Sequence, residues 1–355
     1  MDAYTRVVKT IKHETVDRPP TDFVATPEVL EQLLKHFNVE SAFEVQNLLE
    51  IDMRWVYPKY IGPHEFSGAA GVAVEGKDFL GIVWKPVKNE FATYNEIAVS
   101  PLADIKSVKE VEDYNWPSAD WFDFSHLKEE IKRINDKERH FIGFFAGGAF
   151  ETPWYMRGME NFLTDLLIQP EIAEAISRKA REFYKARALK ALEQSDGLID
   201  MIGSGGDIGT QRGMMISPEV WRKSIKPNTK ELIRSFKDMG YYTFYHSCGS
   251  LTPVIDDFIE MGLDILDPIQ ISADGMEPEN LKAEFGDRLT FHGGVDEQTM
   301  LPVLPPSELE LEIVRLIDTL GRNGGYIPCA AHAIQPDTSI ENIITMYETI
   351  RNYQY

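Results

Sequence analysis

The sequence predicts an α/β protein built as a single (β/α)8 barrel, a TIM barrel, over residues 1–355. Three observations predict this fold. Short apolar segments alternate with amphipathic segments, polar residues follow several of the apolar segments, and 355 residues suit one barrel-sized domain. A doubly wound open sheet is the competing architecture. We favour the barrel because it gathers the ends of all its strands on one rim, whereas an open sheet collects them at one crevice.

Eight segments are expected to form the strands of the barrel. Each is a short apolar run bounded by glycine, proline or polar residues. In chain order they are residues 21–25, 51–57, 140–145, 198–203, 241–246, 264–267, 289–293 and 325–329.

Helices between these strands are predicted by their start and stop signals. Ser217 followed by Pro218 is typical of a helix start, and Gly240 is expected to end that helix. An apolar stripe at residues 313, 316, 317 and 320, followed by a glycine, predicts another helix near the end of the chain. Two further starts have capping-box spacing, namely Ser307 with Glu310 and Thr338 with Glu341.

Residues 60–116 interrupt the barrel pattern. This stretch is richer in glycine and β-branched residues, and 72–74 and 81–84 are expected to form a hairpin. We expect an insertion here, an N-terminal β-hairpin excursion that acts as a lid over the barrel mouth.

Composition and charge exclude several classes of protein. The net charge of -21 argues against nucleic acid as the main partner and against adsorption to anionic membranes. No apolar run approaches the ~18 residues of a transmembrane helix, and the first residues lack the apolar core of a signal peptide. Two cysteines cannot form a disulfide framework. We therefore expect a cytoplasmic protein without membrane contact, either a monomer or a homodimer.

The segment that ends in His246 carries the most informative pair of side chains. His246 and Cys248 are two residues apart, so in a strand they would point to the same side. With Cys329 as a third ligand they would form a zinc site that keeps one position open. His332 is the rival third ligand. In the alternative interpretation His246 is a hydrogen-bonded rim residue and Cys248 is a small buried apolar residue.

Asp207 lies in a glycine-rich loop, residues 203–211, that follows a predicted strand. The loop lacks the dinucleotide fingerprint and the lysine of a phosphate-binding loop. We expect the glycines to let the backbone approach a ligand closely while Asp207 points into the cavity. The alternative role for Asp207 is a loop cap.

Three further polar residues follow or lie within predicted strands. Glu151 stands among apolar and aromatic residues, and burial there would raise its pKa, as a general acid requires. Asp296 is a candidate for the barrel rim. His292 is expected to be a core histidine that faces the helix layer.

With these residues in hand, the chain resembles the uroporphyrinogen decarboxylase superfamily, and within it the branch of cobalamin (corrinoid)-dependent methyltransferases. The resemblance covers most of the chain and is clearest from about residue 141 onward. The motifs that carry it are Arg157-Gly158-Met159-Glu160-Asn161, Ser217-Pro218-Glu219-Val220-Trp221, His246-Ser247-Cys248-Gly249, Asp264-Ile265-Leu266-Asp267-Pro268-Ile269-Gln270, Gly293-Gly294-Val295-Asp296 and residues 334–342.

The resemblance implies a TIM barrel and a choice between two activities. The decarboxylases carry N-terminal arginines that clamp porphyrin carboxylates, but no arginine pair follows Arg18 here, and the charge of -21 suits a polycarboxylate poorly. The methyltransferases hold zinc with a His-x-Cys pair, which His246 and Cys248 match, and a distant cysteine. Cys329 is the candidate for that third ligand, although His332 stands at the more usual position.

The activity implied is transfer of a methyl group from a small methylated substrate to a corrinoid protein, with zinc or acid assistance. Glu151, Asp207 and His246 are the candidate catalytic residues, and His246, Cys248 and Cys329 the candidate metal ligands. Aromatic residues near the candidate loops, among them Trp154, Tyr155 and Tyr245, and the lack of an arginine clamp favour an aromatic methyl ether as substrate. The alternative is a metal-free lyase or decarboxylase in which Asp207 stabilises charge.

Overall fold

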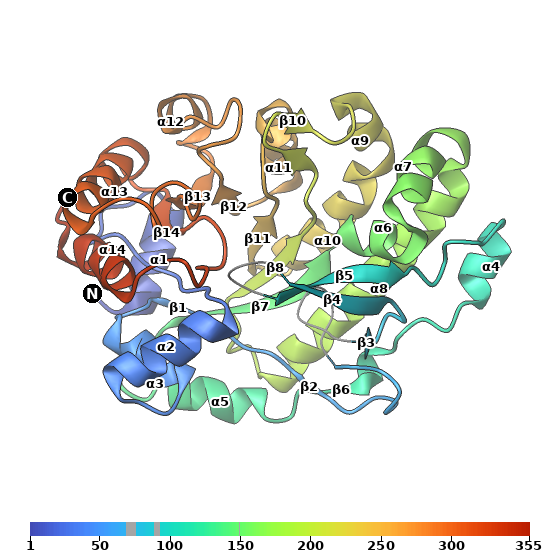
Figure 1. Cartoon of the computed structure of the whole chain (residues 1–355), viewed down its shortest axis with the longest axis horizontal. Helices are drawn as coiled ribbons and strands as arrows, with labels where there is room; N and C mark the ends of the chain where they lie inside the picture. Colours follow the sequence, from blue (N-terminus) through green and yellow to red (C-terminus); the bar gives the residue numbers. More distant parts are fainter. Residues whose placement is uncertain (69–75, 89–92, 149) are drawn as a thin grey trace.

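A parallel sheet of seven strands forms the centre of the molecule. The computed structural model describes residues 1–68, 76–88, 93–148 and 150–355. The sheet curls, with helices on its outer face (Figure 1). In spatial order its strands are β1 (Met53–Trp55), β7 (Phe141–Gly148), β8 (Met201–Gly205), β11 (Tyr242–His246), β12 (Ile265–Ile269), β13 (Thr290–Val295) and β14 (Tyr326–Ala330). Seven of the eight predicted strands are thus confirmed, in chain order.

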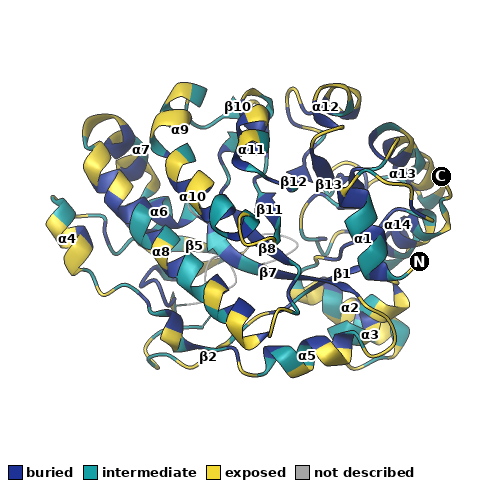
Figure 2. Ribbon diagram, turned by 180° about the vertical axis from the view of Figure 1, so that it is seen from behind, coloured by how far each residue is buried: buried dark blue, intermediate teal, exposed yellow. Residues whose placement is uncertain are grey.

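The helices occupy the connections that the sequence predicts. They are α1 (Ala3–Ile11), α2 (Pro27–Phe37), α3 (Ala42–Leu48), α4 (Val108–Asp113), α5 (Leu127–Ile134), α6 (Glu151–Arg157), α7 (Met159–Ile168), α8 (Pro170–Gln194), α9 (Pro218–Ser224), α10 (Lys226–Lys237), α11 (Ile255–Met261), α12 (Pro278–Phe285), α13 (Pro306–Leu320) and α14 (Ile340–Asn352). Most of their buried residues face the interior of the molecule, and their exposed residues face outward (Figure 2). No described helix is both long and apolar enough to cross a bilayer.

The predicted first strand, residues 21–25, forms only one bridge, between Ala25 and Ile334. It nevertheless lies in the gap of the sheet, because the Thr21 carbonyl accepts from the amides of Asp52 and Met53, both at 3.1 Å, and the Val24 carbonyl accepts from Ile334. The amides of Thr21 and Phe23 donate to aspartate side chains, those of Asp52 and Asp22, and not to a neighbouring strand, which limits the ladder. The barrel is therefore closed by an extended segment instead of an eighth strand.

The barrel interior is filled at its N-terminal end by apolar side chains. Helix α1 contributes to this layer, so it covers the start of the strands rather than joining the outer ring. The members are Val7, Ile11, Met53, Phe141, Met201, Phe244, Ile265 and Ile327.

Trp55 lies in the next interior layer, and a glycine makes room for it. A Cβ atom at Gly203 would stand 2.9 Å from the ring of Phe145 and 3.3 Å from the indole of Trp55. Because interior packing leaves few voids, Gly203 fits this position and a larger residue would displace the indole. The indole nitrogen of Trp55 is thereby placed 2.9 Å from Asp22, to which it donates a hydrogen bond.

The excursion contains a small antiparallel sheet of β3 (Gly76–Lys77), β4 (Val83–Lys88) and β5 (Thr93–Val99). Residues 72–74 of the predicted hairpin lie outside the described residues, and of 81–84 only Val83 and Trp84 lie in β4. Two further short pairs complete the strands, β2 (Lys59–Tyr60) with β6 (Phe122–Asp123) and β9 (Gly209–Thr210) with β10 (Gly213–Met214).

Arg157 attaches the end of this excursion to the barrel. Its guanidinium donates to the carbonyls of Leu102, at 2.9 Å, and Ala103, at 2.7 Å, and pairs with the buried Asp165 at 2.7 Å. The Arg157-Gly158-Met159-Glu160-Asn161 motif therefore fixes the excursion beside α6.

The helix signals are correct in type and imprecise in position. Ser217 caps α9, accepting from the amide of Val220. The helix expected to run to Gly240 breaks into α9 and α10 because Pro227 lacks an amide hydrogen and stands in the first turn of α10. The two predicted capping boxes are wrong: α13 begins at Pro306 without a side-chain cap, and Ser339 caps α14.

Candidate active site

The candidate residues meet at the carboxyl ends of the strands. His246 is the last residue of β11, Asp207 follows β8, and Glu151 begins α6 directly after β7. In a parallel barrel these ends share one rim, which is where barrel enzymes place catalytic groups. The structure therefore brings Glu151, Asp207, His246 and Cys248 together as the sequence predicts.

His246 is held by the carboxylate of Asp267. Its Nδ1 donates to Oδ2 of Asp267 at 2.6 Å, which leaves Nε2 facing Cys248 and Asp207. The Sγ atom of Cys248 and Oδ1 of Asp207 each lie 3.6 Å from Nε2. A histidine whose second nitrogen is bound by a carboxylate is the usual arrangement for a metal ligand.

The possible metal ligands in the described part of the chain are His246, Cys248 and His332, whose donor atoms all lie within 4.8 Å of one another. The rings of His246 and His332 are 5.9 Å apart. His332 is exposed, in the loop after β14, whereas the other two are partly buried. Two imidazoles and a thiol are ligands that zinc prefers, so these residues fit a zinc ion.

Cys329 does not belong to this group in the structure. It is buried on β14, and its Sγ lies 3.6 Å from Nδ1 and 3.5 Å from Nε2 of His292. His292 is also buried, but it faces the barrel interior and not the helix layer as the sequence suggested. Its ring packs edge-on against Phe244.

Two loops are joined around the His-x-Cys pair. The amide of Cys248 donates to Oδ1 of Asp207 at 2.8 Å, and Ser247 Oγ accepts from the amide of Ile208 at 3.1 Å. A Cβ at Gly209 would stand 2.6 Å from the Cys248 carbonyl, so this glycine permits the close approach of the loops. The glycine-rich loop thus approaches the 246–250 loop, and Asp207 serves as a cap as well as a rim carboxylate.

The environment raises the pKa values of both His246 and Cys248, for different reasons. Burial alone would lower the pKa of His246, but the Asp267 carboxylate and then Cys248 raise it well above its ordinary value. Burial raises the pKa of the Cys248 thiol, an effect that His246 opposes. A metal ion requires the thiolate and a neutral imidazole, so metal binding at this site would release protons.

Glu151 has the strongest signature of a proton donor. Burial, followed by the nearby Asp207 charge, raises the pKa of Glu151 from 4.5 to about 7, while His246 and Tyr155 oppose the rise. Tyr155 donates to Oε1 of Glu151 at 3.4 Å. A carboxyl group with this pKa carries its proton for about half of the time at neutral pH, as general acid catalysis requires.

Aromatic side chains adjoin this carboxyl group. The rings of Trp154 and Tyr155 are 4.1 Å apart, and Trp84 on β4 of the excursion lies edge-on to Tyr155 at 5.4 Å. The excursion therefore packs an aromatic ring against Tyr155, the residue that hydrogen-bonds to Glu151.

Other predicted residues have different places. Asp296 is buried, and its Oδ1 caps the following turn by accepting from the amides of Gln298 and Thr299. The sequence did not single out Asp22 or Gln270. The side-chain oxygen of Gln270 accepts a hydrogen bond from the backbone amide of Gly249 at 2.9 Å. Asp22 was detectable as an acidic residue inside an otherwise apolar run.

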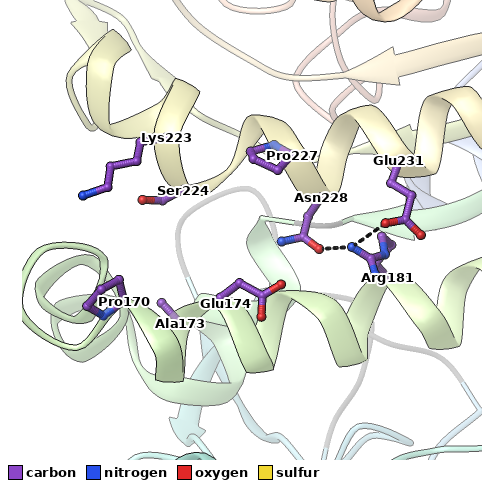
Figure 3. Close-up of a pocket in the computed structure, with 9 residues that line it drawn as sticks. All are labelled: Pro170, Ala173, Glu174, Arg181, Lys223, Ser224, Pro227, Asn228 and Glu231. Carbon is purple, nitrogen blue, oxygen red and sulfur yellow. Dashed lines mark hydrogen bonds and ion pairs between the residues drawn. The ribbon is translucent and has the colours of Figure 1, made fainter.

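Two pockets lie away from this rim. One of 390 Å³ lies between α8 and the pair α9 and α10, where Arg181 contacts Asn228 and Glu231 (Figure 3). The other, of 860 Å³, is lined by residues of α3 and α5 and by Arg54 and His140. Neither is lined by a candidate catalytic residue or metal ligand.

Comparison with known proteins supports the fold. A solved structure described as a methyltransferase from Methanosarcina mazei matches with a TM-score of 0.71 and 16% identity, covering 99% of this chain and 98% of that one. A curated relative, uroporphyrinogen decarboxylase of Thermus thermophilus, is 24% identical over 136 residues. That alignment covers 38% of this chain and 38% of the relative's length.

The family assignment agrees with the barrel and with the motifs at its mouth. The family model described as "Uroporphyrinogen decarboxylase (URO-D)" matches residues 3–353, nearly the whole chain. This protein belongs to the uroporphyrinogen decarboxylase family.

Proposed function

We propose that this chain is a methyltransferase of its family, which moves a methyl group from a small methylated substrate to a separate corrinoid protein. The observation that carries the proposal is the combination, on one rim, of the group His246, Cys248 and His332 with a carboxyl group of pKa about 7 at Glu151. The similarity to a structure described as a methyltransferase supports it.

In this mechanism Glu151 protonates the leaving group. The methyl carbon passes to the corrinoid of the partner protein while the electron pair of the carbon–heteroatom bond stays on the heteroatom. The Glu151 carboxyl group gives its proton to that atom, and the resulting carboxylate is reprotonated from solvent. Burial, and second the Asp207 charge, keep the Glu151 pKa high enough for the proton to be present at neutral pH.

His246, Cys248 and His332 would hold a zinc ion beside this acid. Zinc, when bound, would supply a Lewis acid for the heteroatom that carries the methyl group. Cys329, the third ligand expected from the sequence, is the alternative to His332 and would have to leave His292 to reach the group. Elemental analysis of four proteins decides between them: wild type, Cys248→Ala, His332→Ala and Cys329→Ala.

We expect about one zinc per chain in the wild type and in Cys329→Ala, and loss of zinc in the other two variants. Zinc lost only with Cys329 would restore the cysteine as the third ligand. If the wild type takes up no zinc even when zinc is offered, methyl transfer would have to depend on acid catalysis by Glu151 alone.

We propose an aromatic methyl ether as the substrate. The support is the aromatic pair next to Glu151: Tyr155 hydrogen-bonds to Glu151, and the partly buried Trp154 ring packs against Tyr155, so a flat ring could stack there. The test is methyl transfer from guaiacol- or veratrole-like ethers to cob(I)alamin, followed by its absorption spectrum, with Glu151→Gln as the inactive control. An unchanged spectrum across a panel of methyl donors would contradict methyl transfer itself.

The second candidate function is that of a metal-free lyase or decarboxylase. It is supported by the family model and the curated relative, both of which are described as uroporphyrinogen decarboxylase. In a metal-free lyase, the Asp207 carboxylate would stabilise positive charge that develops on the substrate. Full activity of Cys248→Ser in a lyase assay would support this function over the first.

A further inference from the structure

A row of buried polar side chains leads from the candidate metal site into the barrel interior. Asp267 lies between two histidines: its Oδ2 accepts from Nδ1 of His246 at 2.6 Å, and its Oδ1 accepts from Nδ1 of His292 at 2.5 Å. The other nitrogen of His292 faces Oδ2 of Asp22 at 3.2 Å. All three distances are within hydrogen-bonding range.

Asp22 is itself fixed by the barrel. Its Oδ1 accepts from the amide of Phe23 at 2.7 Å, and its Oδ2 also accepts from the indole of Trp55 at 2.9 Å. Trp55 in turn occupies the interior space beside Gly203. The row therefore ends in rigid packing, at the segment that closes the barrel.

We propose that His292 is a positioning residue for the metal site, which acts through Asp267 on His246. Asp267 has two oxygens, and each is bound by a different histidine. The bond from His292 fixes the rotation of the carboxylate, so the other oxygen meets Nδ1 of His246 and Nε2 of His246 points toward Cys248 and His332.

Energy favours this arrangement over a free carboxylate. Asp267 and His292 are both buried, and a buried carboxylate without a second donor would lose solvation that no protein group replaces. Hydrogen bonds from an imidazole to a carboxylate are charge-assisted and directional, so they orient as well as stabilise. His292 touches none of the three ligands in a described hydrogen bond, which is why we place it as a positioning residue and not as a ligand.

The proposed orientation of His246 by His292 does not depend on a metal ion; only its expected effect on zinc affinity rests on the proposed function. The geometric part can be tested on metal-free protein. Two substitutions at one position separate the two bonds of His292. An asparagine amide reaches where Nδ1 of the imidazole stood, so His292→Asn keeps the donor to Asp267. A glutamine amide reaches where Nε2 stood, so His292→Gln keeps only the donor to Asp22.

The first readout is the imidazole N–H resonances of metal-free protein labelled with 15N-histidine, with His246 assigned by a His246→Gln variant. We expect a downfield Nδ1–H resonance for His246 in the wild type and in His292→Asn, and its loss or a large upfield shift in His292→Gln. His140→Gln is the matched control, because it places the same amide at another buried histidine, which lies next to Arg54 just before the start of β7 and contacts none of the candidate ligands. It should leave the His246 resonance unchanged.

The second readout is zinc affinity measured by competition with a chelator. Partners beyond the ligands typically contribute about 10- to 100-fold to metal affinity, so His292→Gln should weaken binding by about tenfold or more. His292→Asn should stay within about threefold of the wild type.

The outcomes separate this inference from the proposed function. An unchanged His246 resonance in His292→Gln overturns the positioning role, whether or not zinc binds. If His292→Gln loses that resonance but neither the wild type nor the variants bind zinc, the positioning role stands and the metal site is overturned. If neither variant folds, the wild type alone decides: it must show a slowly exchanging Nδ1–H resonance of His292, and the absence of that resonance overturns the inference.

Discussion

The protonation of Glu151 offers the sharpest test of the site. Its pKa is raised from 4.5 to about 7, with burial as the largest cause and the Asp207 charge second. A tenfold change in proton affinity corresponds to about 1.4 kcal/mol, so the ionised form is disfavoured in the folded protein by about 3 kcal/mol. Glu151→Gln removes this cost while keeping the size of the side chain.

The sign of the effect on stability follows from proton binding. Between pH 4.5 and 7 the folded protein keeps a proton on Glu151 that the unfolded chain has released. The free energy of unfolding therefore falls as pH rises through this range, and the penalty is complete above the folded pKa. Below pH 4.5 both states are protonated and no penalty exists. The free energy of unfolding of Glu151→Gln minus that of the wild type should therefore be about 3 kcal/mol larger at pH 8 than at pH 4.5.

The assay is urea unfolding of both proteins from pH 4.5 to 8, with the 13C carboxyl resonance of Glu151 titrated in parallel. Asp207→Asn is the companion variant, because the amide keeps an oxygen for the Cys248 amide and removes only the charge. It should lower the pKa of Glu151 without returning it to 4.5, since burial remains. A stability difference that does not change with pH, or a Glu151 that titrates near 4.5, would refute the reasoning.

Two further predictions concern packing. Gly203→Ala should lower the free energy of unfolding by about 1–3 kcal/mol, because its Cβ would stand 2.9 Å from the ring of Phe145 and 3.3 Å from the indole of Trp55; an unchanged urea midpoint would contradict this. Arg157→Ala should cost about 3–5 kcal/mol, because it leaves Asp165 buried without its partner, and should raise hydrogen exchange in the excursion. Its control is Arg178→Ala, whose exposed ion pairs should contribute less than about 1 kcal/mol, and equal losses in the two variants would count against the anchoring role.

The local sequence determined the elements and most of the rim. Apolar runs bounded by glycine and proline predict strands because side-chain alternation and turn residues are local properties, and seven of the eight strands lie where they are predicted. The same locality explains why His246 and Cys248 could be paired: two residues at one strand end share a side whatever the rest of the fold does. Glu151 was detectable from its apolar neighbours alone.

Tertiary structure decided how distant strand ends meet. Cys329 and His332 are three residues apart on one strand end, and only the path of the loop after β14 shows that His332 joins Cys248 while Cys329 lies against His292. Asp22 comes near His292 because an extended segment closes the barrel across 270 residues of chain. No periodicity encodes such contacts, because they depend on the closure of the sheet and on which interior positions share a layer.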